Sequence, residues 1–110
     1  MKAKYISHGE HECQFMTIGK IYEVIGIEAD WYRLISDDDD LYLFPLDRIE
    51  IIDRSEPDFW VSEINDGVRY AMPFTWSQPG FFEDYHDGVE AVVKKFWEEC
   101  ERYYGISKNV

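Results

Sequence analysis

Residues 19–53 read GKIYEVIGIEADWYRLISDDDDLYLFPLDRIEIID, and this stretch decides the fold. It contains four apolar runs, at Ile21–Glu28, Trp31–Ser36, Leu41–Phe44 and Ile49–Asp53, which short acidic breaks separate. The runs are rich in Ile, Val, Tyr, Phe and Trp, which are the residues that fit a pleated, half-buried surface. Short runs of this composition between turn residues predict a small, tightly curled antiparallel sheet.

Single residues within and around this stretch predict where the strands bend and end. Gly26 interrupts the first run, which indicates a bulge or a sharp bend. Pro45 ends the third run because it has no N–H to donate to a neighbouring strand. Residues 46–48 fit one short turn of the 3₁₀ type before the last strand. Towards the N-terminus, Lys2–Ser7 is predicted to form a first strand, and residues 14–18 a further short strand or an ordered loop.

The second half of the chain begins with a linker at Arg54–Asp58 and continues with a hairpin signal. Two β-rich runs, Phe59–Ile64 and Val68–Met72, flank the sequence Asn-Asp-Gly at residues 65–67, which favours a tight turn. Residues 73–80, PFTWSQPG, contain two prolines and are predicted to form a loop.

The last element is predicted to be an amphipathic helix. A shorter helical turn at Phe81–His86 leads into it, Asp87 and Glu90 are spaced as a capping box, and Gly105 lies where a C-terminal glycine belongs. Three glutamates of this helix, Glu98, Glu99 and Glu101, are expected to face solvent. Apolar side chains recur at helical spacing at Val89, Val92, Val93, Phe96, Trp97, Cys100, Tyr103 and Tyr104. The fold class predicted is therefore α+β: a small β-barrel, a β-hairpin, and a C-terminal helix packed on the sheet.

The length of 110 residues suits a single domain, with the barrel at 1–53 and the hairpin and helix at 54–110. The net charge is -12, from 11 basic and 23 acidic side chains that are spread evenly along the chain. Such a field repels nucleic acid and anionic lipid, so neither is expected as a partner, and it favours a basic protein partner. The oligomeric state is not indicated by the sequence.

The N-terminal residues MKAKYISHGEHEC contain no apolar stretch of the kind a secretory signal needs, and no run reaches the ~18 apolar residues of a membrane span. A cytoplasmic protein is therefore expected. Its two cysteines, Cys13 and Cys100, are expected to be reduced thiols, with Cys100 buried on the apolar side of the helix.

Four short motifs carry a resemblance to a known class of proteins. They are G-K-x-Y-E-V from Gly19, W-Y-R-L from Trp31, Y-L-F-P from Tyr42 and I-E-I-I from Ile49, with an acidic turn before the third. This arrangement resembles small bacterial SH3-like barrel proteins, some of which are presumed immunity proteins encoded beside polymorphic toxins. The resemblance implies a barrel whose meandering strands close on themselves, and a role in neutralising a toxin. The A-L-Y-D-Y run of peptide-binding SH3 domains is absent, which argues against recognition of proline-rich peptides.

Two clusters invite a metal hypothesis. His8, His11 and Cys13 have side chains that bind zinc, and Cys100 or His86 would have to supply a fourth ligand. No C-x-x-C or H-E-x-x-H pattern is present, so a polar N-terminal loop is the preferred interpretation. The run Asp37–Asp40 lacks the alternate spacing, central glycine and closing glutamate of a calcium loop, and is better explained as a solvated turn. No metal or cofactor is expected.

Catalysis is not expected either. Asp84, His86 and Asp87 are close in sequence, but no candidate nucleophile lies beside them, and Asp87 is explained as a helix cap. We therefore predict that the protein is not an enzyme.

The residues predicted to bind a partner are mostly acidic. Four carboxylates on the turn Asp37–Asp40, next to Glu28 and Asp30, could face a basic protein surface and accelerate association. In the loop at residues 73–80, Trp76 and Phe74 are the candidates for an exposed aromatic anchor, with a lid over the core as the alternative role. The predicted set is Glu28, Asp30, Asp37, Asp38, Asp39, Asp40 and Trp76.

Two functions remain open at this point. The first is a non-catalytic acidic interaction protein, such as an immunity or inhibitor protein that neutralises a basic toxin. The alternative is an SH3-like module that binds a small ligand or a peptide through the barrel face and the loop at residues 73–80.

Overall fold

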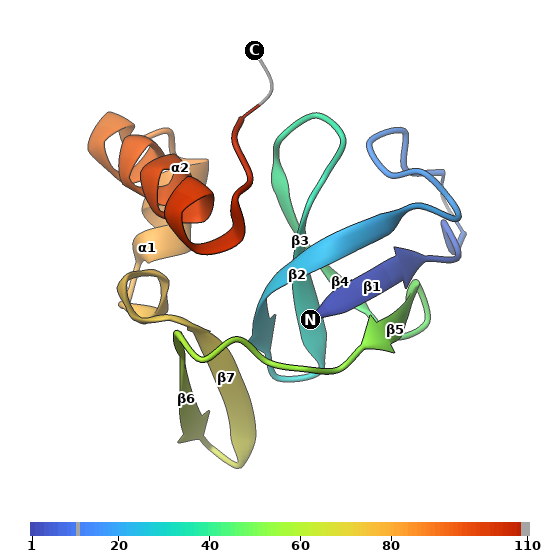
Figure 1. Cartoon of the computed structure of the whole chain (residues 1–110), viewed down its shortest axis with the longest axis horizontal. Coiled ribbons are helices and arrows are strands. Elements are labelled where there is room, and N and C mark those ends of the chain that lie inside the picture. The colour runs from blue at the N-terminus through green and yellow to red at the C-terminus, as the bar shows by residue number, and fades with distance from the viewer. Residues whose placement is uncertain (11, 109–110) are drawn as a thin grey trace.

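A computed structural model describes residues 1–10 and 12–108 of the chain (Figure 1). The fold is α+β, with seven strands followed by helical segments. The elements are β1 (Lys2–Tyr5), β2 (Ile21–Glu28), β3 (Trp31–Ile35), β4 (Leu41–Pro45), β5 (Ile49–Asp53), β6 (Trp60–Asn65), β7 (Val68–Pro73), the 3₁₀ helix η1 (Phe74–Ser77), α1 (Phe81–His86) and α2 (Glu90–Tyr104). Over the described residues, no helix has the length and apolar character needed to cross a bilayer.

Strand β2 is the centre of the antiparallel sheet because it pairs with three other strands. Its first residues pair with β1 and its last with β7 along one edge, while β3 pairs along the other edge. The register between β2 and β3 shifts between Val24 and Gly26, which confirms the predicted bulge at Gly26. The bulge and the strand twist let one long strand serve two differently oriented parts of the sheet.

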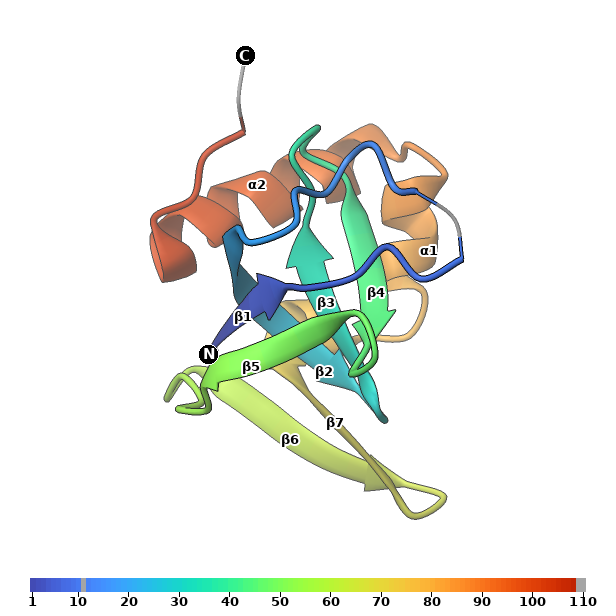
Figure 2. The same cartoon turned by 90° about the vertical axis from the view of Figure 1, so that its right-hand side faces the viewer.

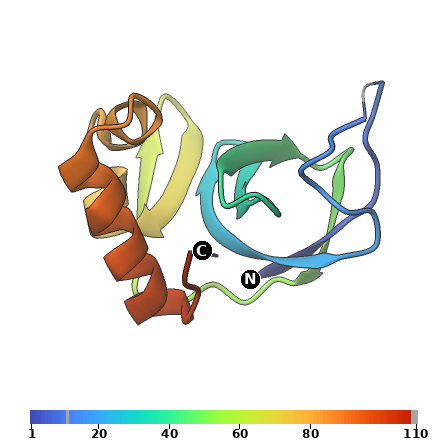
Figure 3. The same cartoon turned by 90° about the horizontal axis from the view of Figure 1, so that it is seen from above.

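The sheet is open. Its main path runs β4-β3-β2-β1-β5, and no pairing joins β4 to β5 in the part of the chain that the structure describes. The predicted curled antiparallel sheet is therefore confirmed, while closure into a barrel is not. In Figure 3 strands β1 to β5 curl around one centre, and α1 and α2 lie on the other side, beside β6 and β7. Residues 14–18 form no strand, so of the two predicted alternatives the loop is correct.

Two hydrophobic cores lie on the two faces of β2. Val24 faces the first and Ile25 the second, because successive side chains of a strand point to opposite faces. The first core is formed by Ala3, Tyr5, Met16, Tyr22, Val24, Leu34, Phe44 and Ile49. The second, between the sheet and the helices, is formed by Ile25, Leu41, Met72, Trp76, Phe81, Tyr85, Phe96 and Cys100.

The β6–β7 hairpin forms as predicted and projects from the rest of the sheet (Figure 2). Its strands are joined by Asp66 and Gly67, whose φ angles of 51° and 81° are both left-handed. Positive φ at both central residues matches the right-handed twist of the strands, and Gly67 adopts it without a steric cost.

Helix α2 is fastened to the sheet at its C-terminal end. The Tyr104 hydroxyl donates a hydrogen bond to the carbonyl of Ile25 (3.0 Å) and accepts one from Nε1 of Trp60 (2.6 Å). The helix ends at Gly105, whose φ of 68° confirms the predicted glycine cap.

Two predictions about α2 are wrong. Asp87 does not cap it, because Asp87 ends α1 by donating its N–H to the Glu83 carbonyl, and Val89 precedes α2 without a side-chain cap. Glu99 does not face solvent but is 4% exposed, next to the buried Cys100. Its carboxylate has a charged partner in Arg102, at 3.5 Å between Oε2 and Nη2.

Candidate functional site

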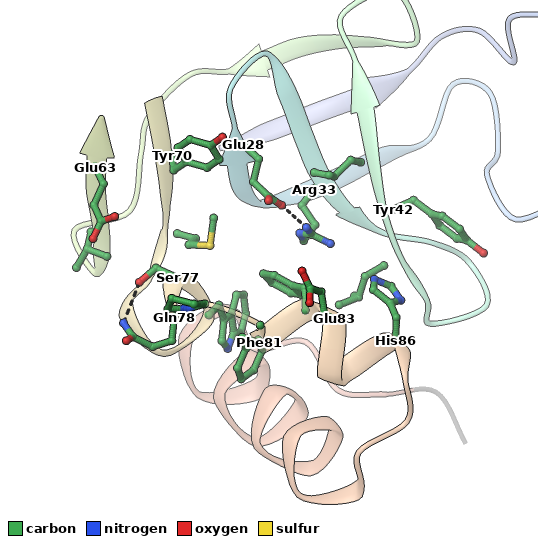
Figure 4. Close-up of a pocket in the computed structure, with 18 of the residues that line it drawn as sticks. Glu28, Arg33, Tyr42, Glu63, Tyr70, Ser77, Gln78, Phe81, Glu83 and His86 are labelled. Carbon is green, nitrogen blue, oxygen red and sulfur yellow. Dashed lines mark hydrogen bonds and ion pairs between the residues drawn. The ribbon is translucent and has the colours of Figure 1, made fainter. Parts of the chain in front are cut away.

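A cleft of about 980 Å³ lies between the sheet and α1 (Figure 4). The strand register explains its floor, because directly paired residues place their side chains on the same face. Glu63 of β6 pairs with Tyr70 of β7, and Tyr70 pairs with Glu28 of β2. Arg33 of β3 pairs with Leu43 of β4. Five strands therefore supply the floor, and η1 and α1 supply the facing wall.

Arg33 is the central charged residue of the cleft. It points from β3 towards α1 (Figure 4) and is 5% exposed. Its Nη2 donates a hydrogen bond to Oε2 of Glu28, and its guanidinium carbon lies 3.7 Å from the ring centroid of Phe82. Nε has no hydrogen-bond acceptor among the described residues. Burial lowers the pKa of Arg33, while the Glu28 carboxylate acts in the opposite direction.

The rest of the lining combines carboxylates with aromatic rings. Glu63, Glu83 and Asp87 are exposed, and none of them has an ion-pair partner among the described residues. His86 lies on α1, next to Asp87 in sequence. The aromatic residues of the lining are Tyr42, Tyr70, Trp76, Phe81 and Phe82. The cleft therefore combines aromatic rings and the Arg33–Glu28 ion pair with a negatively charged rim, a surface that suits a cation with a flat or apolar stem.

The acidic turn at residues 37–40 is engaged in local hydrogen bonds. The Asp37 carboxylate accepts hydrogen bonds from Thr17 (2.7 Å), Lys20 (2.5 Å) and Tyr22 (3.0 Å), and thereby fastens the long loop between β1 and β2 to the turn. Asp38 accepts a hydrogen bond from the Ser36 hydroxyl, and Asp40 accepts one from the backbone N–H of Leu41. Asp39, at a left-handed φ of 62°, shapes the turn.

The hydrogen bonds to the Asp37 carboxylate make the free energy of unfolding depend on pH. Burial raises the pKa of Asp37, but the hydrogen bonds from Lys20, Thr17 and Tyr22 outweigh it, and the net pKa is lowered from 3.8. A lowered carboxyl pKa contributes stability that is fully present above the unfolded-state pKa and is lost as pH falls through the folded-state pKa. We expect Asp37→Asn to lower the free energy of unfolding at pH 7 by about 1 kcal/mol.

The test is urea unfolding of both proteins between pH 7 and pH 3. The difference between wild type and Asp37→Asn is expected to narrow below about pH 4, where Asp37 of the unfolded wild type becomes protonated. Asp38→Asn is the matched control at pH 7: it changes the next carboxylate of the same turn, which accepts a hydrogen bond from Ser36, and is expected to change the free energy of unfolding by less than about 0.5 kcal/mol. A difference for Asp37→Asn that is equal at every pH contradicts the role of the charged network.

The structure separates the predicted partner-binding residues into two groups. Glu28, Asp40 and Trp76 line the cleft, whereas Asp30 lies in the β2–β3 turn and is exposed. Asp37, Asp38 and Asp39 lie in the β3–β4 turn outside the lining of the cleft.

The two candidate aromatic anchors of the loop at residues 73–80 have opposite exposures. Trp76 is 1% exposed and belongs to the second core, so it is not an exposed anchor in this structure, while Phe74 is 64% exposed. Trp31, the first residue of β3, is 46% exposed.

Sequence reasoning missed Arg33, Phe82, Glu63 and Glu83. A charged residue flanked by apolar ones, as Arg33 is in the run WYRLI, was the one available signal of a buried cation. Of the acid/base candidates, His86 and Asp87 line the cleft and Asp84 does not.

The side chains of the zinc hypothesis are not gathered into one site among the described residues. Nδ1 of His8 accepts a hydrogen bond from the backbone N–H of Cys13 (3.2 Å) and lies 3.2 Å from the Tyr5 hydroxyl. His11 lies outside the described residues. Within residues 1–10 and 12–108, no three His, Cys, Asp or Glu side chains are grouped as metal ligands. Burial raises the pKa of the Cys100 thiol to about 12, which disfavours the thiolate that metals bind.

Comparison of the chain with protein-family models, with curated proteins and with solved structures gives no match. The function of this protein is therefore argued from the cleft itself.

Proposed function

We propose that this chain is a non-catalytic interaction protein that binds a basic protein, and that the cleft between the sheet and α1 is the binding site. The observation that carries the proposal is the rim of the cleft, where Glu63, Glu83 and Asp87 have no ion-pair partner in the described structure. Carboxylates placed in this way attract a positively charged surface from a distance and pair with it on contact. The net charge of -12 acts in the same direction.

Neutralisation of a basic toxin in the cytoplasm is the role we propose for this binding. Its support is the resemblance of residues 19–53 to SH3-like immunity proteins. The order of β1 to β5 agrees with such a barrel, as does the single turn closed by a hydrogen bond from the Arg48 N–H to the Pro45 carbonyl (3.0 Å) before β5. We propose that these five strands correspond to the SH3-like unit and that the hairpin and helices are an addition that creates the cleft.

The proposal is tested by capturing partners at low salt from the native host, identifying them, and measuring the affinity of each purified partner. We expect a basic protein whose affinity falls at least about tenfold between about 50 and about 300 mM salt. The charge-reversal variant Glu63→Lys/Glu83→Lys is expected to bind more weakly than wild type. Partners that are neutral or acidic, or a variant that binds as tightly as wild type, would contradict the proposal.

The size of the cleft supports a second candidate, a module that binds a small ligand. A volume of about 980 Å³ lies within the range of small-molecule sites. A screen of ligands by thermal shift tests this candidate, because a ligand at a hundred times its dissociation constant adds ~2.7 kcal/mol of stability. An uncharged ligand that stabilises the protein independently of salt would favour the module over the interaction protein.

A further inference from the structure

We infer that the cleft recognises an arginine side chain, presented on a peptide segment of the basic partner. This inference rests on the proposed function and specifies the group that enters the site. It follows from three features of the lining: the way in which Arg33 is held, the carboxylates that have no counter-charge, and the donors that have no acceptor.

Arg33 shows how this lining accommodates a guanidinium. Its guanidinium carbon lies over the ring of Phe82, 3.7 Å from the centroid, and Nη2 donates a hydrogen bond to the Glu28 carboxylate. A guanidinium stacks on aromatic rings and pairs with carboxylates in a fixed fork, which a compact ammonium does not. The same two components, rings and carboxylates, recur elsewhere in the lining of the cleft.

The carboxylates on the rim of the cleft can attract a second cation. Glu63 of β6 and Glu83 of α1 both line the cleft, together with Tyr70 and Phe81 (Figure 4). Arg33 is already neutralised by Glu28, so the carboxylates of the rim are left to pair with an incoming side chain. A guanidinium that meets a carboxylate forms charge-assisted hydrogen bonds to it, often two in parallel.

Two donors in the lining favour a peptide over a free amine. Nε of Arg33 and Nε1 of Trp76 are buried and have no acceptor in the described structure. Buried donors without acceptors are uncommon, and each one costs free energy. A peptide segment seated in the cleft brings backbone carbonyls, which are acceptors, together with its arginine; because both nitrogens are covered, a carbonyl reaches them when the side chains that cover them move aside.

The test uses two capped pentapeptides, Ac-Gly-Ser-Arg-Ser-Gly-NH₂ and the same peptide with lysine, titrated into ¹⁵N-labelled protein and followed by NMR. The arginine peptide is expected to shift the amide signals of Tyr70, Phe82 and Glu83 and the Nε–H signals of Arg33 and Trp76. The lysine peptide is expected to bind about fivefold more weakly, because it lacks the stacked fork. Equal affinities, or shifts centred on the turn at residues 37–40, would overturn the inference.

Two matched double variants distinguish binding at the cleft from attraction by the net negative charge of the protein. Glu63→Gln/Glu83→Gln removes two carboxylates from the cleft, and Glu12→Gln/Glu50→Gln removes two exposed carboxylates that lie outside its lining; in Figure 3 β5, which carries Glu50, lies in the curled sheet away from α1. The cleft variant is expected to weaken the arginine peptide about five- to tenfold and the control less than twofold. Equal weakening by both variants overturns the inference, while retained, salt-dependent binding of the basic partner leaves the proposed function standing.

Discussion

Replacing Trp76 by alanine is expected to lower the free energy of unfolding by about 3–5 kcal/mol, the range measured for large aromatic residues removed from cores. Trp76 is the largest fully buried side chain of the protein. Its ring lies 4.5 Å from that of Phe96 and 5.9 Å from that of Tyr104, measured between centroids, so it joins η1 to α2. The alanine variant leaves a cavity between the sheet and the helix that the rigid η1 cannot close.

Phe74→Ala is the matched control for this prediction. Phe74 lies two residues earlier in η1 and is 64% exposed, so its removal is expected to change the free energy of unfolding by less than about 0.5 kcal/mol. Urea unfolding gives the free energy of unfolding of both variants. Far-ultraviolet circular dichroism is the suitable signal, because tryptophan fluorescence would change when Trp76 is removed. Losses of similar size at the two positions would mean that Trp76 does not hold α2 on the sheet.

The features predicted correctly are those that short segments determine by themselves. The bulge at Gly26, the turn at Asp66 and Gly67 and the helix end at Gly105 each depend on a backbone conformation that favours one residue type or one motif. The apolar spacing of residues 89–104 likewise predicted α2, because a helix needs a continuous apolar stripe to pack.

The features that could not be predicted depend on contacts between distant segments. Phe74 and Trp76 occupy the same short loop, and the contact of Trp76 with Phe96, twenty residues later, decides which ring is buried. The capping box failed for a similar reason: the N–H of Asp87 is taken by the last turn of α1. Local sequence does not contain these competing partners.

The cleft itself has no sequence motif because its walls come from both halves of the chain. Glu28 and Arg33 lie in β2 and β3, Glu63 in β6, and Phe82 and Glu83 in α1. The predicted acidic turn was the most visible charge feature of the sequence, yet its first residue, Asp37, is occupied in holding Lys20 and Tyr22. A dense charge run is thus a poorer guide to a site here than the isolated carboxylates that the fold brings together.

Replacing Glu28 by glutamine is expected to lower the free energy of unfolding by about 3 kcal/mol, because it leaves the buried Arg33 guanidinium without a carboxylate. Arg33 is 5% exposed, whereas the Glu28 side chain is 26% exposed. Because Arg33 is more buried than Glu28, the two single substitutions are expected to lower the free energy of unfolding by different amounts. Arg33→Met keeps an apolar stem against Phe82 and leaves Glu28 close enough to water to be hydrated, so its expected loss is about 1–2 kcal/mol.

The double variant Glu28→Gln/Arg33→Met distinguishes an ion pair from two independent effects. Since no buried charge remains in it, its stability is expected to match that of Arg33→Met rather than the sum of the single losses. Glu63→Gln is the control, because Glu63 lines the same cleft and has no ion-pair partner among the described residues. Its free energy of unfolding is expected to stay within about 0.5 kcal/mol of wild type. If Glu28→Gln also stays within that margin, the aromatic ring of Phe82 alone holds the guanidinium. The cleft would then need no carboxylate to accommodate a second guanidinium.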